Sequence, residues 1–295
     1  MSLSQGFYNP QIKPPVWAGP EVMAVSVQRR CDKLGLYPPV GYWPLGDYQG
    51  YDLGGYGNTG ILTNGPTIVP GPDGLMTDFD GNNDYIDCGN NPSVQITGAF
   101  TIFCAFITDD ATENDNKGLL AKWIGSGNKR CYVLYIEYQV DNNPRLAVSV
   151  SINGSSIISA RGNTTLAVNT LYYGAAVYVP STSLTVYLNG VQDGVNTTSI
   201  PASIYNGATN LLIGAHYYLD SPGMYLLDGK IGGTSIFPKA LNSSQIGTLF
   251  EHRHGLLYPE APPVYFFMGA GAPPAGTWPH NPLGWPLDGP LGGPL

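Results

Sequence analysis

The stretch of residues 171–195, LYYGAAVYVPSTSLTVYLNGVQDGV, constrains the fold more than any other part of the sequence. Over residues 184–188, Leu and Val alternate with Thr and Tyr, the period of two that is typical of a strand with one buried face. Asn189 and Gly190 follow, and this pair favours the positive φ angles of a tight hairpin turn. The apolar run before PSTS predicts a second strand, and PSTS itself is typical of a turn. The sequence therefore predicts an antiparallel β-meander at the centre of the chain.

Further short runs, apolar or alternating, recur along the chain and are bounded by Gly, Asn, Pro or Asp. They include AFTIFCAFI, LLAKWI, YVLYIEYQV, RLAVSVSI and NLLIGAHYY. Many short strands at regular spacing are typical of a β-sandwich or barrel. The 39 Gly and 26 Pro residues, with only 12% charged residues, favour a turn-rich β protein over a helical or disordered one.

Two short helices are predicted at the borders of this strand-rich region. The first covers about residues 21–34, where Pro20 suits the start of a helix and Gly35 suits its end. The second begins near Asn242, whose side chain can accept from the amides of a first helical turn.

Charge and cysteine content argue against several classes of protein. The formal net charge is −8, and no run of basic residues is longer than a pair such as Arg29-Arg30, so direct binding of nucleic acid is not expected. The four cysteines, Cys31, Cys88, Cys104 and Cys131, form no CxxC pair, and buried free thiols are favoured over disulfides. No secretory signal peptide or bilayer-spanning apolar stretch is evident, so we expect synthesis in a cytoplasm without membrane insertion.

Pro-rich segments with apolar side chains lie at both ends of the sequence. Residues 1–20 predict an extended N-terminal arm, and residues 255–295, rich in Pro and Gly, predict a C-terminal arm. A disordered leader is the alternative for the first segment. Apolar anchors on a donor-poor chain favour docking onto another protein surface. The candidate anchors are Phe7, Trp17, Tyr265, Phe266, Phe267, Trp278 and Trp285.

Between the arms, an ordered series of motifs over residues 41–254 resembles the concanavalin A-like jelly-roll family, in particular laminin-G-like domains. The motifs are GYWPL at 41–45, FDGNNDYI at 79–86, FTI at 100–102, the hairpin at 184–190, LIG at 212–214, DGKI at 228–231 and ALNSSQI at 240–246. The resemblance implies an all-β, antiparallel two-sheet jelly-roll sandwich. Residues 21–40 are then a short helix and connector.

This resemblance also implies binding chemistry at the loops. Laminin-G-like domains often hold one Ca²⁺, and by resemblance the candidate ligands here are Asp52, Asn58 and Asp228. No cofactor is required by the fold itself. Asp80 to Asp84 is interpreted as a structural turn. Carbohydrate binding is a frequent role of the family, and the aromatic residues that could stack on sugar rings are Tyr48, Tyr51, Tyr56, Tyr217 and Tyr218.

Catalytic residues are not predicted. Related glucan hydrolases need two carboxylates that face each other across a cleft, and their E-x-D-x-x-E pattern is absent here. The nearest run places Glu137 four residues before Asp141, and Glu137 is interpreted as an outward residue of a strand. A glycoside hydrolase is therefore a distant alternative.

A laminin-G-like domain followed by a Pro-rich aromatic segment also resembles the arrangement of many bacteriophage virion proteins. The leading hypothesis is a non-enzymatic virion structural protein, such as a capsid decoration, cement or head-fibre-like subunit. The expected partners are the major capsid protein or other virion proteins, further copies of the chain, and a host-surface glycan. The alternative hypothesis is a free carbohydrate-binding module, with or without calcium.

Overall fold

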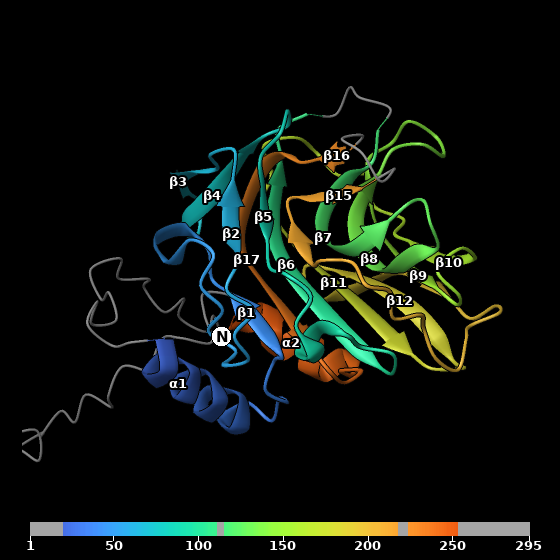
Figure 1. The fold of residues 1–295 in the computed structure, drawn as a ribbon, viewed down its shortest axis with the longest axis horizontal. Coiled ribbons are helices and arrows are strands. Elements are labelled where there is room, and N and C mark those ends of the chain that lie inside the picture. The colour runs from blue at the N-terminus through green and yellow to red at the C-terminus, as the bar shows by residue number, and fades with distance from the viewer. Residues whose placement is uncertain (1–19, 111–114, 218–223, 253–295) are drawn as a thin grey trace, which may run out of the picture. The chain divides into compact units, whose positions relative to one another are not determined.

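A computed structural model of the protein describes residues 20–110, 115–217 and 224–252 (Figure 1). Apart from Pro20, which begins the first helix, the two predicted arms lie outside the described residues, together with their anchors Phe7, Trp17, Tyr265, Phe266, Phe267, Trp278 and Trp285. Tyr218 also lies outside them.

The described residues form mainly β-strands, with one α-helix before them and one after them. The elements are α1 (Pro20–Lys33), β1 (Gly41–Trp43), η1 (Gly46–Tyr48), β2 (Ile61–Thr63), β3 (Thr67–Gly71), β4 (Gly74–Asp80), β5 (Tyr85–Asp87), η2 (Pro92–Val94), β6 (Phe100–Thr108), β7 (Lys117–Ile124), β8 (Lys129–Glu137), β9 (Arg145–Ser151), β10 (Ile157–Arg161), β11 (Tyr172–Val179), β12 (Ser183–Leu188), β13 (Val191–Asn196), β14 (Leu212–Ile213), β15 (Ala215–Tyr217), β16 (Met224–Leu226), β17 (Asp228–Phe237) and α2 (Ser243–Glu251).

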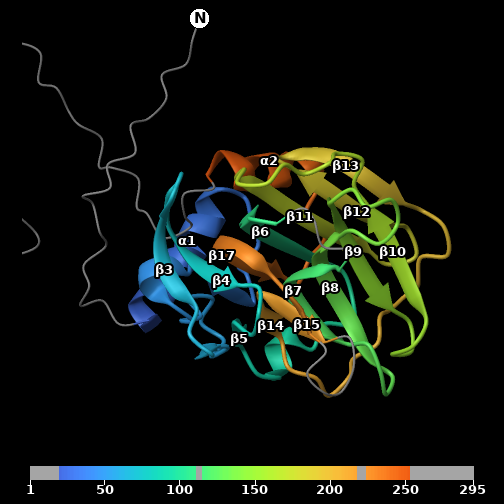
Figure 2. The same cartoon turned by 90° about the horizontal axis from the view of Figure 1, so that it is seen from above.

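The strands form two sheets that lie face to face (Figures 1 and 2). In the first sheet the order is β13-β12-β11-β6-β17-β4-β3, with β1 beside β17. In the second sheet it is β10-β9-β8-β7-β14-β5-β2, and the β15–β16 hairpin lies beside β7. All pairings are antiparallel except one contact between β15 and β7. The predicted jelly-roll sandwich is confirmed.

The space between the sheets is filled by an apolar core to which β6 contributes on one face. Phe100, Ile102, Cys104 and Phe106 point into this core, whereas Phe103 joins a second apolar cluster on the outer face of the first sheet. Successive side chains of a strand point to opposite faces, so both faces of β6 are buried. This double burial explains why the strand reads as a continuous apolar run rather than an alternating one.

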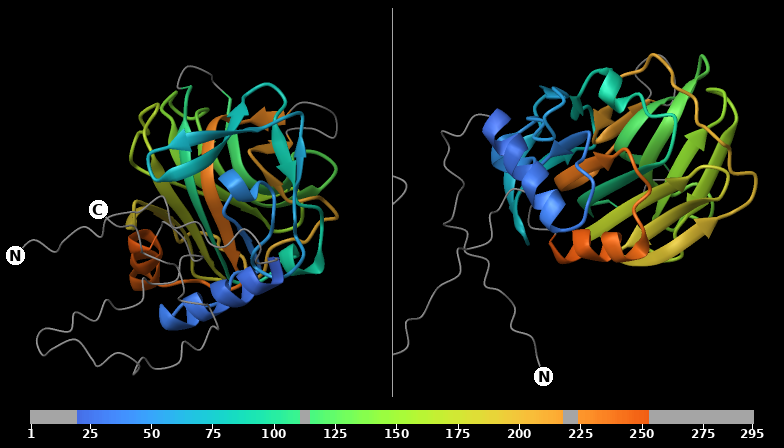
Figure 3. Two further views of the ribbon diagram at one scale, coloured as in Figure 1. Left: turned by 90° about the vertical axis from the view of Figure 1, so that its left-hand side faces the viewer. Right: turned by 90° about the horizontal axis from the view of Figure 1, so that it is seen from below.

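The two helices cover the outer face of the first sheet (Figure 3). Val27 and Cys31 of α1, and Ile246 and Leu249 of α2, contribute to the apolar cluster there. The predicted start of α2 is confirmed by a capping box, in which the Asn242 side chain accepts from the N–H of Gln245 at 2.9 Å and Gln245 reaches back to the Asn242 N–H.

The predicted hairpin turn at the centre of the chain is confirmed, whereas strands β2 and β3 were not predicted. Asn189 and Gly190 have φ angles of 51° and 81°, which confirms the hairpin between β12 and β13. Both strands lie in or beside a part of the sequence where turn residues recur every few positions, and β3 also contains Pro70. Proline is tolerated there because β3 pairs on one side only, with β4, at the edge of the sheet.

The four cysteines are buried free thiols, as predicted. Among the described residues, no helix has the length and apolar content needed to cross a bilayer.

Candidate functional site

Asp52, the first predicted calcium ligand, is buried and saturated by hydrogen bonds from the protein itself. Its Oδ1 accepts from the backbone N–H groups of Tyr42 (3.0 Å) and Gly54 (2.8 Å). Its Oδ2 accepts from the backbone N–H (2.9 Å) and the side-chain Nδ2 (3.0 Å) of Asn58. Only 4% of the surface of Asp52 is exposed. Its carboxylate links the loop after η1, at Gly54 and Asn58, to Tyr42 of β1.

Asn58, the second predicted ligand, is enclosed in the same way. Its Nδ2 also donates to the carbonyl of Val40 (2.8 Å), and its Oδ1 accepts from the hydroxyl of Ser93 (2.9 Å). The Asn58 carbonyl accepts from Nε1 of the fully buried Trp43 at 2.9 Å. These bonds use the oxygen atoms that a calcium ion would need, and they give this loop a structural role.

Asp228, the third predicted ligand, lies elsewhere. It begins β17, opposite Asp80 of β4, whereas Tyr42, which donates to Asp52, faces Ser235 near the other end of β17. A strand advances roughly 3.3 Å per residue, so positions 228 and 235 are about 23 Å apart. The prediction that Asp52, Asn58 and Asp228 form one calcium site is wrong for this reason. Within residues 20–110, 115–217 and 224–252, no three His, Cys, Asp or Glu side chains gather in a way that could hold a metal ion.

The predicted sugar-binding tyrosines occupy different environments. Tyr48 packs against the apolar cluster on the outer face of the first sheet, whereas Tyr51 and Tyr56 are about half exposed on the following loop. Tyr217 belongs to β15 in the second sheet. Of these four residues, Tyr217 lines a cavity and the other three do not line it.

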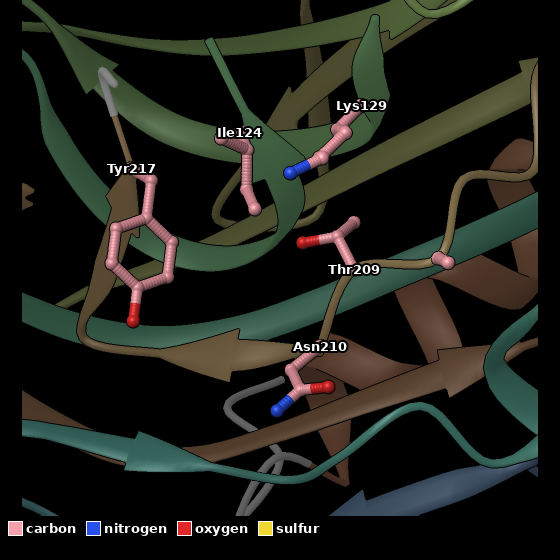
Figure 4. Close-up of a pocket in the computed structure, with 6 residues that line it drawn as sticks. Ile124, Lys129, Thr209, Asn210 and Tyr217 are labelled. Atoms are coloured by element: carbon pink, nitrogen blue, oxygen red, sulfur yellow. The ribbon is translucent and has the colours of Figure 1, made fainter. Parts of the chain in front are cut away.

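The cavity lies where the β7–β8 hairpin meets the loop before β14. It has a volume of about 350 Å³ and is lined by Ile124, Lys129, Ala208, Thr209, Asn210 and Tyr217. In Figure 4 the ring of Tyr217, the side chain of Ile124, the ammonium group of Lys129 and the hydroxyl group of Thr209 surround one space. The volume falls within the usual range for small-molecule sites in proteins, which is roughly 300–1,000 Å³.

Polar contacts orient two of the lining side chains. Burial, and then the neighbouring Tyr85 and Asp87, raise the pKa of Tyr217 to about 12, so its hydroxyl stays protonated at neutral pH. Asn210 donates through Nδ2 to Oδ2 of Asp87 at 2.9 Å, and the other oxygen of Asp87 accepts from the N–H of Gly89 at 2.9 Å. The site therefore offers an aromatic ring beside an amide, a hydroxyl and an ammonium group, a combination that suits a polyhydroxylated ring.

One wall of the cavity, residues 207–210, is held from the protein interior. Lys122 of β7 is fully buried, and its Nζ donates to the carbonyl oxygens of Gly207 (2.5 Å) and Thr209 (2.8 Å). The N–H of Gly207 donates to Sγ of Cys131 at 3.0 Å. Burial lowers the pKa of Lys122, while the adjacent Cys131 acts in the opposite direction. Because the wall is fixed from behind, Thr209 and Asn210 face the cavity in a preformed geometry.

Glu137 lies on the outer side of β8, as interpreted from the sequence, but it is buried there. Its side chain is on the face of β8 opposite the core, but only 5% of its surface is exposed, because Arg161 covers it with Nε 2.6 Å from Oε2. Asp141 also pairs with Arg161, at 2.5 Å, and this contact lowers the pKa of Asp141 to about 2. A glycosidase acid needs a raised pKa, so this pair of carboxylates is unsuited to that role.

His216 is enclosed on the outer face of the second sheet. Its ring contacts Tyr225, with centroids 4.9 Å apart, and Tyr135, with centroids 5.9 Å apart. It is 5% exposed, and burial lowers its pKa to about 3. The imidazole is therefore neutral in the folded protein at physiological pH.

This environment predicts a loss of stability in acid. Between the ordinary pKa of 6.5 and the folded pKa of about 3, the unfolded chain binds a proton at His216 and the folded chain does not. The contribution of His216 to the free energy of unfolding is thus complete above pH 6.5 and decreases as the pH falls. At pH 4.5 it is smaller by about 2–3 kcal/mol. Urea unfolding at both pH values measures the loss. The His216→Phe variant should lose less stability between pH 6.5 and pH 4.5 than the wild type does. An equal loss in the variant and the wild type would show that His216 does not cause the acid sensitivity.

The sequence did not indicate most of the cavity. Ile124, Lys129, Thr209 and Asn210 come from a strand end, a strand start and a loop, and each is unremarkable in its local pattern. A useful signal was present in LLAKWI, where a lysine interrupts an apolar strand. Such a lysine must either reach solvent or find buried acceptors, and Lys122 finds two carbonyl groups.

A sequence profile of the concanavalin A-like lectin/glucanases superfamily matches residues 80–247. No curated protein sequence matches the chain significantly.

Several solved structures share the fold. Domain 4 of AbnA, a GH43 extracellular arabinanase from Geobacillus stearothermophilus solved in complex with arabinotriose, has a TM-score of 0.53 at 18% identity; the match covers 72% of this chain and 97% of that domain. The binding domain of Paraclostridial Mosquitocidal Protein 1 has a TM-score of 0.56 at 18% identity and 73% coverage of this chain. The binding domain of botulinum neurotoxin serotype G has a TM-score of 0.55 at 12% identity, also with 73% coverage. The match spans about half the length of these two toxin domains, 52% and 51%.

Proposed function

This chain belongs to the concanavalin A-like lectin/glucanases superfamily, and from that membership we propose that it is a non-enzymatic carbohydrate-binding protein whose cavity at Tyr217 holds the sugar. The observation that carries the proposal is the composition of the cavity. Tyr217 supplies an aromatic ring for the apolar face of a sugar, and Asn210 and Thr209 supply polar groups for its hydroxyls.

Two further observations support a binding role over a catalytic one. Among the described residues, those that line the cavity include no carboxylate, whereas a glycosidase needs a pair of them. The three solved structures named above are two toxin binding domains and an arabinanase domain that was solved with arabinotriose.

The test is glycan binding by the full chain and two tyrosine variants. Wild-type protein is screened on a glycan array, and the strongest ligand is titrated by calorimetry. We expect Tyr217→Ala to weaken binding at least roughly tenfold, because aromatic stacking contributes on the order of 1–3 kcal/mol. Tyr51→Ala is the matched control, since Tyr51 is an exposed tyrosine outside the cavity. Equal affinity of both variants and the wild type would refute the location of the site.

We also propose that the domain is displayed by a virion, as a capsid decoration, cement or head-fibre-like subunit. The feature that favours this second function is the pair of Pro-rich aromatic segments that flank the domain in the sequence. These segments would bind the major capsid protein or other copies of the chain. Light scattering and co-sedimentation with capsid protein, with and without residues 1–19 and 256–295, test this role. If the full chain assembles or co-sediments with capsid protein and the truncated chain does not, the virion role is supported. If the two chains have the same size and the same co-sedimentation, it is contradicted.

A further inference from the structure

A carboxylate outside the cavity determines which polar atom the cavity offers to a sugar; this step rests on the proposed carbohydrate-binding function. We propose that Asp87 is a positioning residue, which holds the NH₂ group of Asn210 and leaves the amide oxygen Oδ1 for the ligand. The site would therefore select a saccharide that presents a hydroxyl group as a hydrogen-bond donor to Asn210.

Backbone pairing between β5 and β14 brings the two side chains together. Asp87 is the last residue of β5, and β5 pairs with β14. Beyond this pairing, the N–H of Cys88 donates to the carbonyl of Leu211 (2.8 Å), and the N–H of Leu211 donates to the carbonyl of Gly89 (2.8 Å). These reciprocal bonds fix the backbone of Asn210 beside Asp87.

The contact between the two side chains sets the orientation of the amide. A carboxylate only accepts hydrogen bonds, so the NH₂ end of the amide must face it. Oδ2 of Asp87 accepts from Nδ2 of Asn210 at 2.9 Å, and Oδ1 of Asp87 accepts from the N–H of Gly89 at 2.9 Å. The carboxylate is thus held in place itself. Within residues 20–110, 115–217 and 224–252, no group donates to Oδ1 of Asn210, whose side chain is exposed.

An amide oxygen at this point gives the cavity a preference among sugar groups. Asn210 lines the cavity beside Thr209, and the backbone between them is held because Lys122 donates to the Thr209 carbonyl at 2.8 Å. The hydroxyl of Thr209 can donate or accept, so it does not distinguish a donor from an acceptor. Oδ1 of Asn210 only accepts, so it favours a sugar hydroxyl over an ether oxygen, which has no proton to donate.

The variant Asp87→Asn reverses this preference without changing the shape of the side chain. The oxygen of the new amide can still accept from the N–H of Gly89, and its NH₂ group then faces Asn210. The amide of Asn210 would turn over, so that its NH₂ group replaces Oδ1 at the cavity. A sugar hydroxyl can bond to either group, because it both donates and accepts, whereas a methyl ether only accepts. The hydroxyl form should therefore bind both proteins, and the ether should distinguish them.

The experiment measures glycan binding by the full-length wild type and the variants. After a glycan array, methyl glycosides of galactose, glucose, mannose and arabinose are titrated by NMR, followed by each single O-methyl ether of the tightest binder. We expect one ether to bind the wild type about fivefold more weakly than its parent, the effect of one neutral hydrogen bond. Asp87→Asn should remove this penalty and leave the affinity for the parent and the penalties of the other ethers unchanged. Asn210→Ala should remove the same penalty.

The controls separate positioning from folding and from the proposed function. Thermal unfolding shows whether each variant is folded, and Asn210→Ala keeps the test decisive if Asp87→Asn is not. A wild type that binds glycans but tolerates every single O-methylation overturns the inference. An Asp87→Asn or Asn210→Ala variant that keeps the penalty overturns it as well. The carbohydrate-binding function survives these outcomes. It fails, and the role of Asp87 with it, when the full chain binds no glycan.

Discussion

Asp52→Asn is expected to destabilise the protein by about 4 kcal/mol, because four buried donors point at a carboxylate that the variant lacks. Each oxygen of Asp52 accepts two hydrogen bonds, from Tyr42 and Gly54 on one side and from the backbone and side chain of Asn58 on the other. Whichever way the asparagine amide is turned, its NH₂ group faces two N–H donors. Buried hydrogen bonds to a charged group are worth about 1.5–3 kcal/mol each. Urea unfolding monitored by fluorescence measures the loss.

Two comparisons separate this structural role from the calcium role that the sequence suggested. Asp115→Asn makes the same chemical change at an exposed position and should alter the free energy of unfolding by less than about 0.5 kcal/mol. Addition of EDTA should leave the melting temperature of the wild type unchanged. A melting temperature that drops in EDTA and recovers with Ca²⁺, together with a harmless Asp52→Asn, would contradict the structural assignment.

Lys122→Met should lower the free energy of unfolding by about 3 kcal/mol, and it should also weaken glycan binding about tenfold or more. Methionine has a similar length but no donor, so the carbonyl groups of Gly207 and Thr209 lose their buried partner. A buried polar group left without a partner costs about 1–3 kcal/mol. The same change releases the wall that presents Thr209 and Asn210 to the cavity. Unfolding and calorimetric titration measure the two consequences separately.

The matched control is Leu120→Met, which changes a buried residue of the same strand at nearly constant volume. Such substitutions usually cost less than about 1.5 kcal/mol, and this one should leave glycan affinity unchanged. If Lys122→Met bound glycan as well as Leu120→Met does, the wall would not depend on Lys122, and the preformed geometry of the site would have to come from other contacts.

Much of the fold could be predicted because its local signals agree with one another. Asn189-Gly190 adopts the positive φ angles that its hairpin needs, and Asn242 caps α2 as its position suggests. Strands such as β6 were recognisable from their apolar content alone. Strands β2 and β3 were not predicted because turn residues recur through that part of the sequence, and only the sheet order reveals that β3 is an edge strand that tolerates Pro70.

The candidate site could not be predicted in the same way, because its residues come together only in three dimensions. The family resemblance placed calcium at Asp52, but it could not show that the carboxylate is already saturated by the neighbouring backbone. Tyr217 was named together with four other tyrosines because all five lie in or near predicted loops. Tyr217 differs from the other tyrosines because it lies beside the cavity wall formed by residues 207–210. That wall is held by Lys122, which in the sequence only interrupts an apolar strand.

The position of a bound saccharide shows whether the cavity at Tyr217 is the sugar-binding site. Full-length protein would be crystallised with the strongest glycan from the array, or titrated with it while backbone and tyrosine NMR signals are recorded. We expect the sugar to lie against Tyr217, with contacts to Asn210 and Lys129 and little change at Asp52. A sugar bound on the loop of Tyr51 and Tyr56, or on the outer face of the second sheet near His216, would contradict it.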